Sequence, residues 1–183
     1  DDLRFFVPSG LAGWFHRRGI RNLVELDWWQ SDAGTDPETF CVPAQHFSGR
    51  GAYDGNRTLW CGWRLEFEDF SFYFAGDTGY GPIFEQMATV FGPVDLALIP
   101  IGAYAPRWFM WPMHVSPEDA VQIHLDIRWR QAAGMHWGAV VLTDEPLDEP
   151  PRRLEAELVQ RGIPVEDFRV PAHGETLTLE ATQ

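Results

Sequence analysis

The feature that most constrains the fold is a nearly continuous apolar run at Val94–Ile101 (VDLALIPI). Such a run is typical of a strand that is covered on both faces, because successive side chains point to opposite sides of a sheet. A strong helix start follows at residues 116–119 (SPED), with a capping hydroxyl, a proline in the first turn and two acids near the positive end of the helix dipole. A buried strand followed by a helix predicts an α/β fold.

The remaining elements predict a mixed sheet covered by helices. Apolar or alternating segments indicate strands at Leu3–Val7, Asn22–Trp28, Thr39–Ala44 and Ala132–His136, a hairpin of Thr58–Phe67 with Ser71–Ala75, and a final pair of Asp167–Val170 with Thr176–Leu179. Helical spacing or capping indicates helices from the cap Ser9 to Arg18, at Gly81–Phe91 and at Pro151–Arg161, which end at Gly19, Gly92 and Gly162. Hairpins followed by strand–helix alternation favour this architecture.

Composition limits which classes of partner and which cellular compartment we expect. The 183 residues suit one domain, and the net charge of −13 makes nucleic acid an improbable partner, because phosphates are repelled. Cys41 and Cys61 are too few for a disulfide scaffold, which favours a reducing compartment. No apolar run reaches the roughly 18 residues of a membrane span. We therefore expect a cytoplasmic protein, and the start at Asp1 without Met fits a truncated or processed product.

Polar residues follow three apolar strands. His46 ends the segment PAQH, Asp77 lies between two glycines in SFYFAGDTGY, and His136 follows a short strand in MHWG. Each has an ordinary alternative: a satisfied surface or core histidine for His46, a turn or helix-cap residue for Asp77, and an imidazole that donates to a backbone carbonyl for His136. Together, two imidazoles and a carboxylate suit Zn²⁺, and three protein ligands with an open position are typical of a catalytic site.

Longer motifs carry a family resemblance. The strings PAQHF, RGAYDGNRTLWCGW, FYFAGDTGYGPIFEQ, FGPVDLALIPIGAYAPRWFM, HVSPEDAVQIH and MHWG occur in this order. They resemble the second half of the N-acyl-phosphatidylethanolamine-hydrolysing phospholipase D family, a branch of the metallo-β-lactamase superfamily. The resemblance runs from about Leu3 to Gly162. It implies an αββα-type fold and a phosphodiester hydrolase that releases phosphatidic acid and an N-acylethanolamine.

The same resemblance implies roles for individual residues. His46, Asp77 and His136 would be metal ligands, with Asp77 catalytic and bridging two zinc ions. His114 would lie near the substrate phosphate, as a catalytic and substrate-binding residue; an exposed loop histidine is the alternative. Phospholipid or another phosphodiester is the expected substrate, and a membrane surface and a second copy of the chain are expected partners. His124 and His173 match no ligand position and are interpreted as structural. His16 lies near the end of a predicted helix and is interpreted as a solvent-facing residue that interacts with the helix dipole.

The segment Tyr104–Met113 (YAPRWFMWPM) is rich in large apolar residues and has no acid. The segment is interpreted as a lipid-facing or acyl-chain-contacting loop, with Trp108 as a substrate-binding residue, and aromatic core packing of the segment is an equal alternative. Arg107 is a candidate to bind a phosphate, and an ordinary salt bridge is its alternative.

One departure from the family pattern affects all of these roles. The superfamily motif H-x-H-x-D-H is absent, because no two of the six histidines lie two residues apart. We therefore expect residues 1–183 to be the carboxyl-terminal portion of a single metallo-β-lactamase-like domain. Zinc binding should then be reduced or absent, and part of the sheet should lack its second layer.

Two other functions stay open from the sequence. The superfamily also hydrolyses lactones and soluble phosphodiesters, and a fold alone does not choose among substrates. A catalytically inactive fragment or binding domain would explain the absent motif, although it would have no chemical need for His46, Asp77 and His136.

Overall fold

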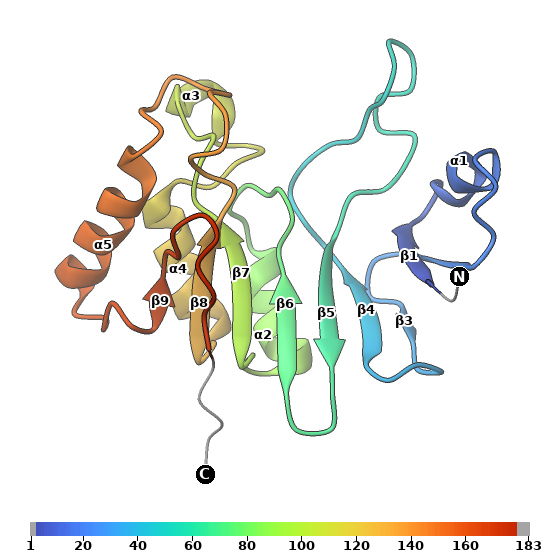
Figure 1. Ribbon diagram of the computed structural model, residues 1–183, viewed down its shortest axis with the longest axis horizontal. Helices are drawn as coiled ribbons and strands as arrows, with labels where there is room; N and C mark the ends of the chain where they lie inside the picture. The colour runs from blue at the N-terminus through green and yellow to red at the C-terminus, as the bar shows by residue number, and fades with distance from the viewer. Residues whose placement is uncertain (1–2, 179–183) are drawn as a thin grey trace.

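A computed structural model describes residues 3–178 of the protein (Figure 1). A small parallel sheet is formed by β1 (Phe5–Pro8) and β2 (Leu23–Leu26), which are joined by the short helix α1 (Ala12–His16). This unit lies beyond β3 and β4 at one side of the larger sheet. It is tied to that sheet by the indole of Trp28, which donates to the carbonyl of Trp60 over 2.7 Å.

The larger sheet has seven strands in the order β3-β4-β5-β6-β7-β8-β9. The strands are β3 (Ser31–Asp32), β4 (Glu38–Val42), β5 (Gly62–Glu66), β6 (Ser71–Phe74), β7 (Leu96–Pro100), β8 (Gln131–Met135) and β9 (Phe168–Arg169). Pairing is antiparallel from β3 to β6 and parallel from β6 to β9. The sheet is therefore mixed, as the sequence predicts, and β4, β6, β7 and β8 end at the same edge.

The larger helices lie together on one face of this sheet (Figure 1). They are α2 (Ile83–Phe91), α4 (Pro117–Ile127) and α5 (Glu149–Arg161), while α3 (Arg107–Met110) is a single turn near the end of the sheet. The predicted start of α4 is confirmed: Ser116 and Asp119 form a reciprocal capping box, and Pro117 occupies the first turn.

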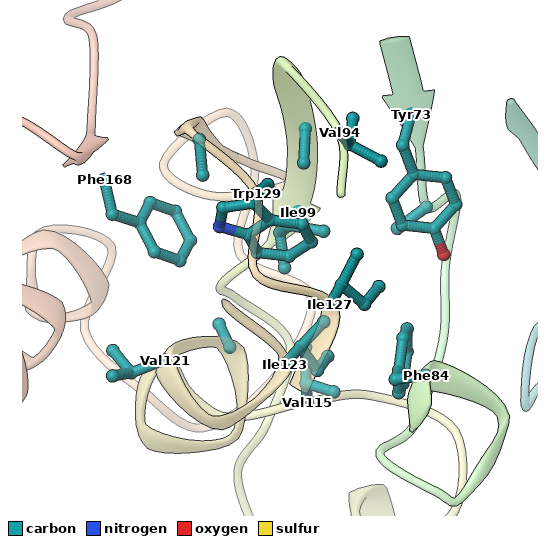
Figure 2. Packing of buried hydrophobic residues seen from close by; sticks show 14 of the residues in the cluster. Tyr73, Phe84, Val94, Ile99, Val115, Val121, Ile123, Ile127, Trp129 and Phe168 are labelled. Atoms are coloured by element: carbon teal, nitrogen blue, oxygen red, sulfur yellow. The ribbon is translucent and has the colours of Figure 1, made fainter. Parts of the chain in front are cut away.

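The hydrophobic core lies between the sheet and these helices (Figure 2). Tyr73 and Ile99 from the strands pack with Phe84 of α2 and Ile123 of α4, and all four are essentially inaccessible to solvent. Leu154 and Leu158 place α5 against the same cluster. This core is the layer that fixes the ends of β6, β7 and β8, which carry the site.

The opposite face of the sheet is also apolar. Leu65, Phe72 and Leu98 alternate with the core residues and are half-buried, and Phe74 is 38% exposed. No helix among residues 3–178 covers this face (Figure 1). The family resemblance implies a two-layer fold of which this chain contains only a portion, and an apolar sheet face without a second layer is the expected result.

Four details differ from the sequence predictions. Ser9 does not cap a helix: its N–H donates to the carbonyl of Leu26, so it continues the β1–β2 pairing, and α1 begins at Ala12. β9 pairs with β8 in parallel rather than with Thr176–Leu179, whose described residues form no strand; Leu179 lies outside the described residues. β3 and α3 were not predicted.

Candidate metal centre

Four loops at one edge of the sheet carry the predicted site residues. His46 follows β4, Asp77 follows β6, His114 precedes α4 and His136 follows β8. Because β4, β6 and β8 run in the same direction, their carboxyl ends meet at this edge, where open α/β sheets usually place their sites. The hydrophobic core packs against β6, β7 and β8 and so supports the loops that follow these strands.

Gln45 ties three of these loops together. Its N–H donates to the hydroxyl of Thr78 over 2.9 Å, and its carbonyl accepts from the N–H of Gly79 at 2.7 Å. Its side-chain amide donates to the carbonyl of Pro112, also at 2.9 Å. The N–H of Val115 completes the network by donating to the carbonyl of Thr78. The loops that carry His46, Asp77 and His114 are thus held in fixed relative positions.

The four side chains converge into what we call the His/Asp cluster: His46, Asp77, His114 and His136. One ligand atom each from His46, Asp77 and His114 lie within 4.8 Å of one another. Nε2 of His136 lies 3.4 Å from Oδ1 of Asp77. The His114 ring lies between the other two imidazoles, with ring centroids 5.1 Å from His46 and 5.4 Å from His136.

The ring nitrogens of this cluster fit a divalent cation. Nδ1 of His46 lies 2.9 Å from the carbonyl of Phe47, which suits donation from Nδ1–H and leaves Nε2 with its lone pair. That Nε2 is buried without a hydrogen-bond partner, as are Nδ1 of His114 and Nδ1 of His136. Buried polar atoms are normally paired, so the unpaired nitrogens of His46 and His114, two residues that converge on Asp77, fit a bound ligand. At His136 the nitrogen that faces Asp77 is Nε2.

The electrostatics of the cluster favour neutral imidazole at His114. Burial is the largest influence and lowers the pKa of His114 to about 4, and the neighbouring His46 and His136 act in the same direction against the carboxylate of Asp77. At neutral pH this ring is therefore uncharged. A neutral imidazole can bind a metal or hydrogen-bond a substrate oxygen.

His136 has an unusual backbone. Its φ of 57° lies in the left-handed region, which costs a non-glycine residue about 1–2 kcal/mol. Strained conformations of this kind occur preferentially at functional sites, where the surrounding fold compensates for them. The strain at the end of β8 is consistent with a requirement that this imidazole face Asp77.

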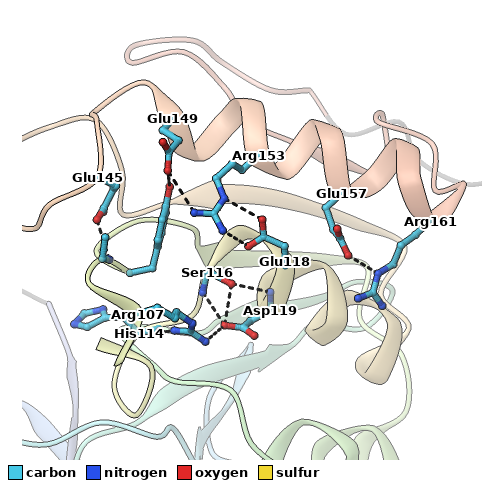
Figure 3. Close-up of polar contacts among 12 residues, drawn as sticks. Arg107, His114, Ser116, Glu118, Asp119, Glu145, Glu149, Arg153, Glu157 and Arg161 are labelled. Atoms are coloured by element: carbon cyan, nitrogen blue, oxygen red, sulfur yellow. Dashed lines mark hydrogen bonds and ion pairs between the residues drawn. The ribbon is translucent and has the colours of Figure 1, made fainter. Parts of the chain in front are cut away.

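Arg107 and Trp108 lie away from the centre of the cluster. The guanidinium of Arg107 pairs with Asp119 and donates to the carbonyl of His114 over 2.8 Å (Figure 3). For Arg107 the sequence allowed either a phosphate contact or an ordinary salt bridge, and the structure contains the salt bridge. The segment is divided between its two interpretations: Tyr104 and Met110 are buried, as core packing predicts, whereas Trp108 is 78% exposed.

His114 is the residue whose role the sequence defined least. We expected it near a substrate phosphate, but its position among His46 and Asp77 also makes it a candidate metal ligand. The sequence signal was present in its place directly before the capping box of α4, which holds the end of that loop. Its contact with the Asp77 loop depends on long-range hydrogen bonds that no local pattern reveals.

Comparison with known proteins identifies the family. A family model described as "Beta-lactamase superfamily domain" matches residues 2–137, most of the chain. The chain belongs to the β-lactamase superfamily. A metallo hydrolase of Ignicoccus hospitalis has the same fold, with a TM-score of 0.72 at 20% identity, over 98% of this chain and 70% of that protein. The metallo-β-lactamase fold predicted from the sequence is thus confirmed.

Two relatives within this superfamily carry more specific names. "N-acyl-phosphatidylethanolamine-hydrolyzing phospholipase D 1" of Caenorhabditis elegans is 41% identical over 84% of this chain and 46% of its own length. The mitochondrial protein of that activity in Saccharomyces cerevisiae is 36% identical over 85% of this chain and 35% of its own length. The chain therefore spans less than half the length of either relative.

Proposed function

We propose that this chain provides part of the metal centre of a zinc-dependent phosphodiester hydrolase that acts on N-acyl phosphatidylethanolamine. The observation that carries the proposal is the convergence of His46, Asp77, His114 and His136 with three buried, unpartnered ring nitrogens. The printed names of the C. elegans and yeast relatives support the substrate class.

Imidazole nitrogens and a carboxylate are ligands that zinc accepts at about 2.0–2.2 Å. Nε2 of His46 and a carboxylate oxygen of Asp77 would hold one ion, and Asp77 with a ring nitrogen of His136 would hold a second. When bound, zinc lowers the pKa of coordinated water to about 7 and neutralises charge that develops on a phosphoryl group. The phospholipase D reaction then separates phosphatidic acid from the N-acylethanolamine.

The residues of the chain would position the metal and the substrate and would form no covalent bond to the substrate. Asp77 is the sole carboxylate of the cluster and would fix the metal against His46 and His136. His114, whose low pKa keeps it neutral, would bind either the metal or a phosphoryl oxygen of the substrate. Arg107 holds the His114 carbonyl in this structure, and a contact of its guanidinium with a phosphate stays a prediction.

Zinc titration and substrate assays test this proposal together. The purified chain is titrated against a competing chelator, and hydrolysis of N-acyl phosphatidylethanolamine is compared with that of a soluble phosphodiester and a lactone. Asp77→Asn should weaken zinc binding by more than about 100-fold, because losing a ligand costs more than the roughly 10–100-fold of an outer-shell change. Asp69→Asn, an exposed aspartate in the β5–β6 turn, is the matched control.

The results separate the competing functions. Zinc-dependent hydrolysis of the phospholipid, lost in Asp77→Asn and kept in Asp69→Asn, supports the proposal. Faster hydrolysis of the lactone or of the soluble diester would show that the proposed substrate class is wrong. Absence of zinc binding to the chain, and to any longer protein that contains it, would favour a binding domain.

We also propose that α3 contacts a lipid surface. Trp108 and Phe109 on this single turn and Trp111 directly after it are exposed, at 78%, 54% and 53%. Aromatic rings of this kind are favoured at the interface between water and lipid. No helix among residues 3–178 has the length and apolar character needed to cross a bilayer. A cytoplasmic location and a dimer stay predictions.

A further inference from the structure

The loop after β7 lies against the backbone of His136. We call residues 101–105 the β7 loop. A Cβ at Gly102 would lie 2.4 Å from the carbonyl oxygen of His136, so the two backbones are in direct contact. The N–H of Ile101 donates to the carbonyl of Met135 over 3.0 Å. The position of the β7 loop therefore determines the path of the chain at the end of β8, where the imidazole of His136 is attached.

Two residues at this contact have a left-handed backbone. The angle φ is 63° at Ala103 and 57° at His136. A Cβ makes this conformation unfavourable, so it persists only where the surrounding structure holds it in place. Ala103 is also buried, so its N–H requires a hydrogen-bond partner within the protein. The contact between the β7 loop and His136 therefore depends on the group that binds the loop.

The carboxylate of Glu145 is that group (Figure 3). Its Oε1 accepts from the N–H of Ala103 at 2.6 Å, and its Oε2 accepts from the N–H of Ala105 at 3.0 Å. The hydroxyl of Thr143 donates to the same Oε2 at 2.7 Å. In return, the N–H of Asp144 donates to the carbonyl of Ala105 over 3.2 Å. Residues 143–145 and the β7 loop are thus fastened to each other.

These hydrogen bonds favour a charged carboxylate. Burial acts to raise the pKa of Glu145, but the hydrogen bonds from Thr143, Ala105 and Ala103 outweigh it and hold the pKa below the ordinary value. Glu145 is therefore ionised at neutral pH, and hydrogen bonds to an ionised acceptor are roughly twice as strong as neutral ones. A glutamine of the same shape would place its NH₂ group opposite a group that also donates.

We propose that Glu145 is a positioning residue for His136. By accepting from two N–H groups of the β7 loop, it keeps that loop against the His136 carbonyl. It thereby fixes the imidazole whose Nε2 lies 3.4 Å from Oδ1 of Asp77. The inference rests on the proposed function, in which Asp77 and His136 hold the second ion. Glu145 acts through the backbone, so its role is neither that of a metal ligand nor that of a catalytic residue.

NMR spectroscopy of the isotopically labelled, metal-free chain tests this positioning without any need for zinc. In Glu145→Gln, the amides of Ala103 and Ala105 should exchange with solvent at least about tenfold faster, because each loses a hydrogen bond to a charged group. The Cα and Cβ resonances of His136, which report its backbone angles, should shift in the same variant.

Two further variants make this result decisive. Glu149→Gln is the matched control, because that half-buried carboxylate accepts from the hydroxyl of Tyr104 in the same loop, and it should leave the His136 resonances unchanged. Thr143→Val removes one hydrogen bond to Glu145 and keeps the charge, so it should give a smaller change of the same kind even if Glu145→Gln does not fold. Faster exchange in the β7 loop with unchanged His136 resonances, or equal changes in Glu149→Gln, would overturn the inference.

Zinc titration then connects the position of His136 to the metal. The parent should bind two ions, which the imidazole resonances of His46 and His136 distinguish. Glu145→Gln should weaken binding of the ion at His136 by about 10–100-fold, the usual effect of a change outside the ligands, and should affect the ion at His46 less. Glu149→Gln should bind both ions as the parent does.

The two measurements separate this inference from the proposed function. Shifted His136 resonances in Glu145→Gln, without zinc binding by the parent or by any longer protein that contains it, would refute the proposed function alone. Two ions bound with equal affinity by the parent and by Glu145→Gln would refute the positioning role alone.

Discussion

At the scale of single residues, the site depends on close contacts that leave no room for larger side chains. Gly79 shows this most clearly. A Cβ at this position would lie 2.6 Å from the carbonyl oxygen of Pro112 and 2.7 Å from Nε2 of Gln45. The glycine therefore allows the loops of His46, Asp77 and His114 to meet.

Gly79→Ala should separate these loops. We expect a loss of about 1–3 kcal/mol in the free energy of unfolding, as for other over-packed positions, together with weaker zinc binding. Urea denaturation and zinc titration measure the two effects. Gly49→Ala is the control, because its nearest neighbours would lie 3.8 Å from the new Cβ. Equal stability of the two variants would contradict this role of Gly79.

His124 makes a separate, pH-dependent contribution. It is buried on α4 beside the rings of Trp129 and Phe168, and burial is the main cause of its lowered pKa, opposed by the charge of Asp167. Below the ordinary histidine pKa of about 6.5, the unfolded chain takes up a proton that the folded chain does not. Acid therefore favours unfolding through this residue.

His124→Gln should flatten the fall of the unfolding free energy as pH decreases from about 7 toward the lowered pKa of His124. Denaturation of the metal-free chain at several pH values measures this slope. The same substitution at His16, which is exposed at the end of α1, is the control. A slope that is identical in the parent and in His124→Gln would refute the assignment.

At the scale of elements, the capping box of α4 connects sequence to site. Ser116 and Asp119 exchange hydrogen bonds at the start of the helix, directly after His114 (Figure 3). The cap thus fixes both the first turn of α4 and the loop that brings His114 into the cluster.

Ser116→Ala should lower the free energy of unfolding by about 1 kcal/mol, the usual cost of a lost cap. Thermal denaturation measures the effect. Thr89→Ala, which removes an exposed hydroxyl bonded to the carbonyl of Glu85 on α2, should change stability by less than about 0.5 kcal/mol. A Ser116→Ala protein as stable as the parent would show that the capping box contributes little.

The elements that the sequence predicts best are those with strong local signals. Val94–Ile101 contains β7, and the SPED segment starts α4 where expected, because apolar periodicity and caps act within a few residues. β3 has only two polar residues and no periodicity. It exists through pairing with β4, which no local pattern encodes.

The candidate site could be predicted only in part, and again from local signals. His46, Asp77 and His136 each end or follow a strand, so their convergence follows from strand direction once the sheet is known. The role of Gln45 depends on contacts across 33 and 67 residues of sequence, which only the folded chain brings together. The metal-ligand roles themselves stay predictions.

At the scale of the whole molecule, the two ends of the sheet differ. The end with the His/Asp cluster also carries α3, while the β5–β6 turn lies at the other end (Figure 1). The exposed rings of Trp108, Phe109 and Trp111 are therefore at the same end of the sheet as the His/Asp cluster.

Trp108→Ala and Trp111→Ala should each reduce binding to phospholipid vesicles, because each removes an exposed ring from the proposed contact. Co-sedimentation with vesicles measures this, and we expect a several-fold loss for each variant. Phe67→Ala removes an exposed ring from the β5–β6 turn and should bind as the parent does. Unchanged binding in both tryptophan variants would exclude α3 as the lipid contact.

X-ray absorption at the zinc edge of the metal-loaded chain tests the central claim most directly. We expect a shell of nitrogen and oxygen at about 2.0–2.2 Å with imidazole scattering, which decreases in both His46→Ala and His136→Ala. An ion surrounded by water alone, or imidazole scattering that neither substitution changes, would contradict the assignment of these side chains as metal ligands.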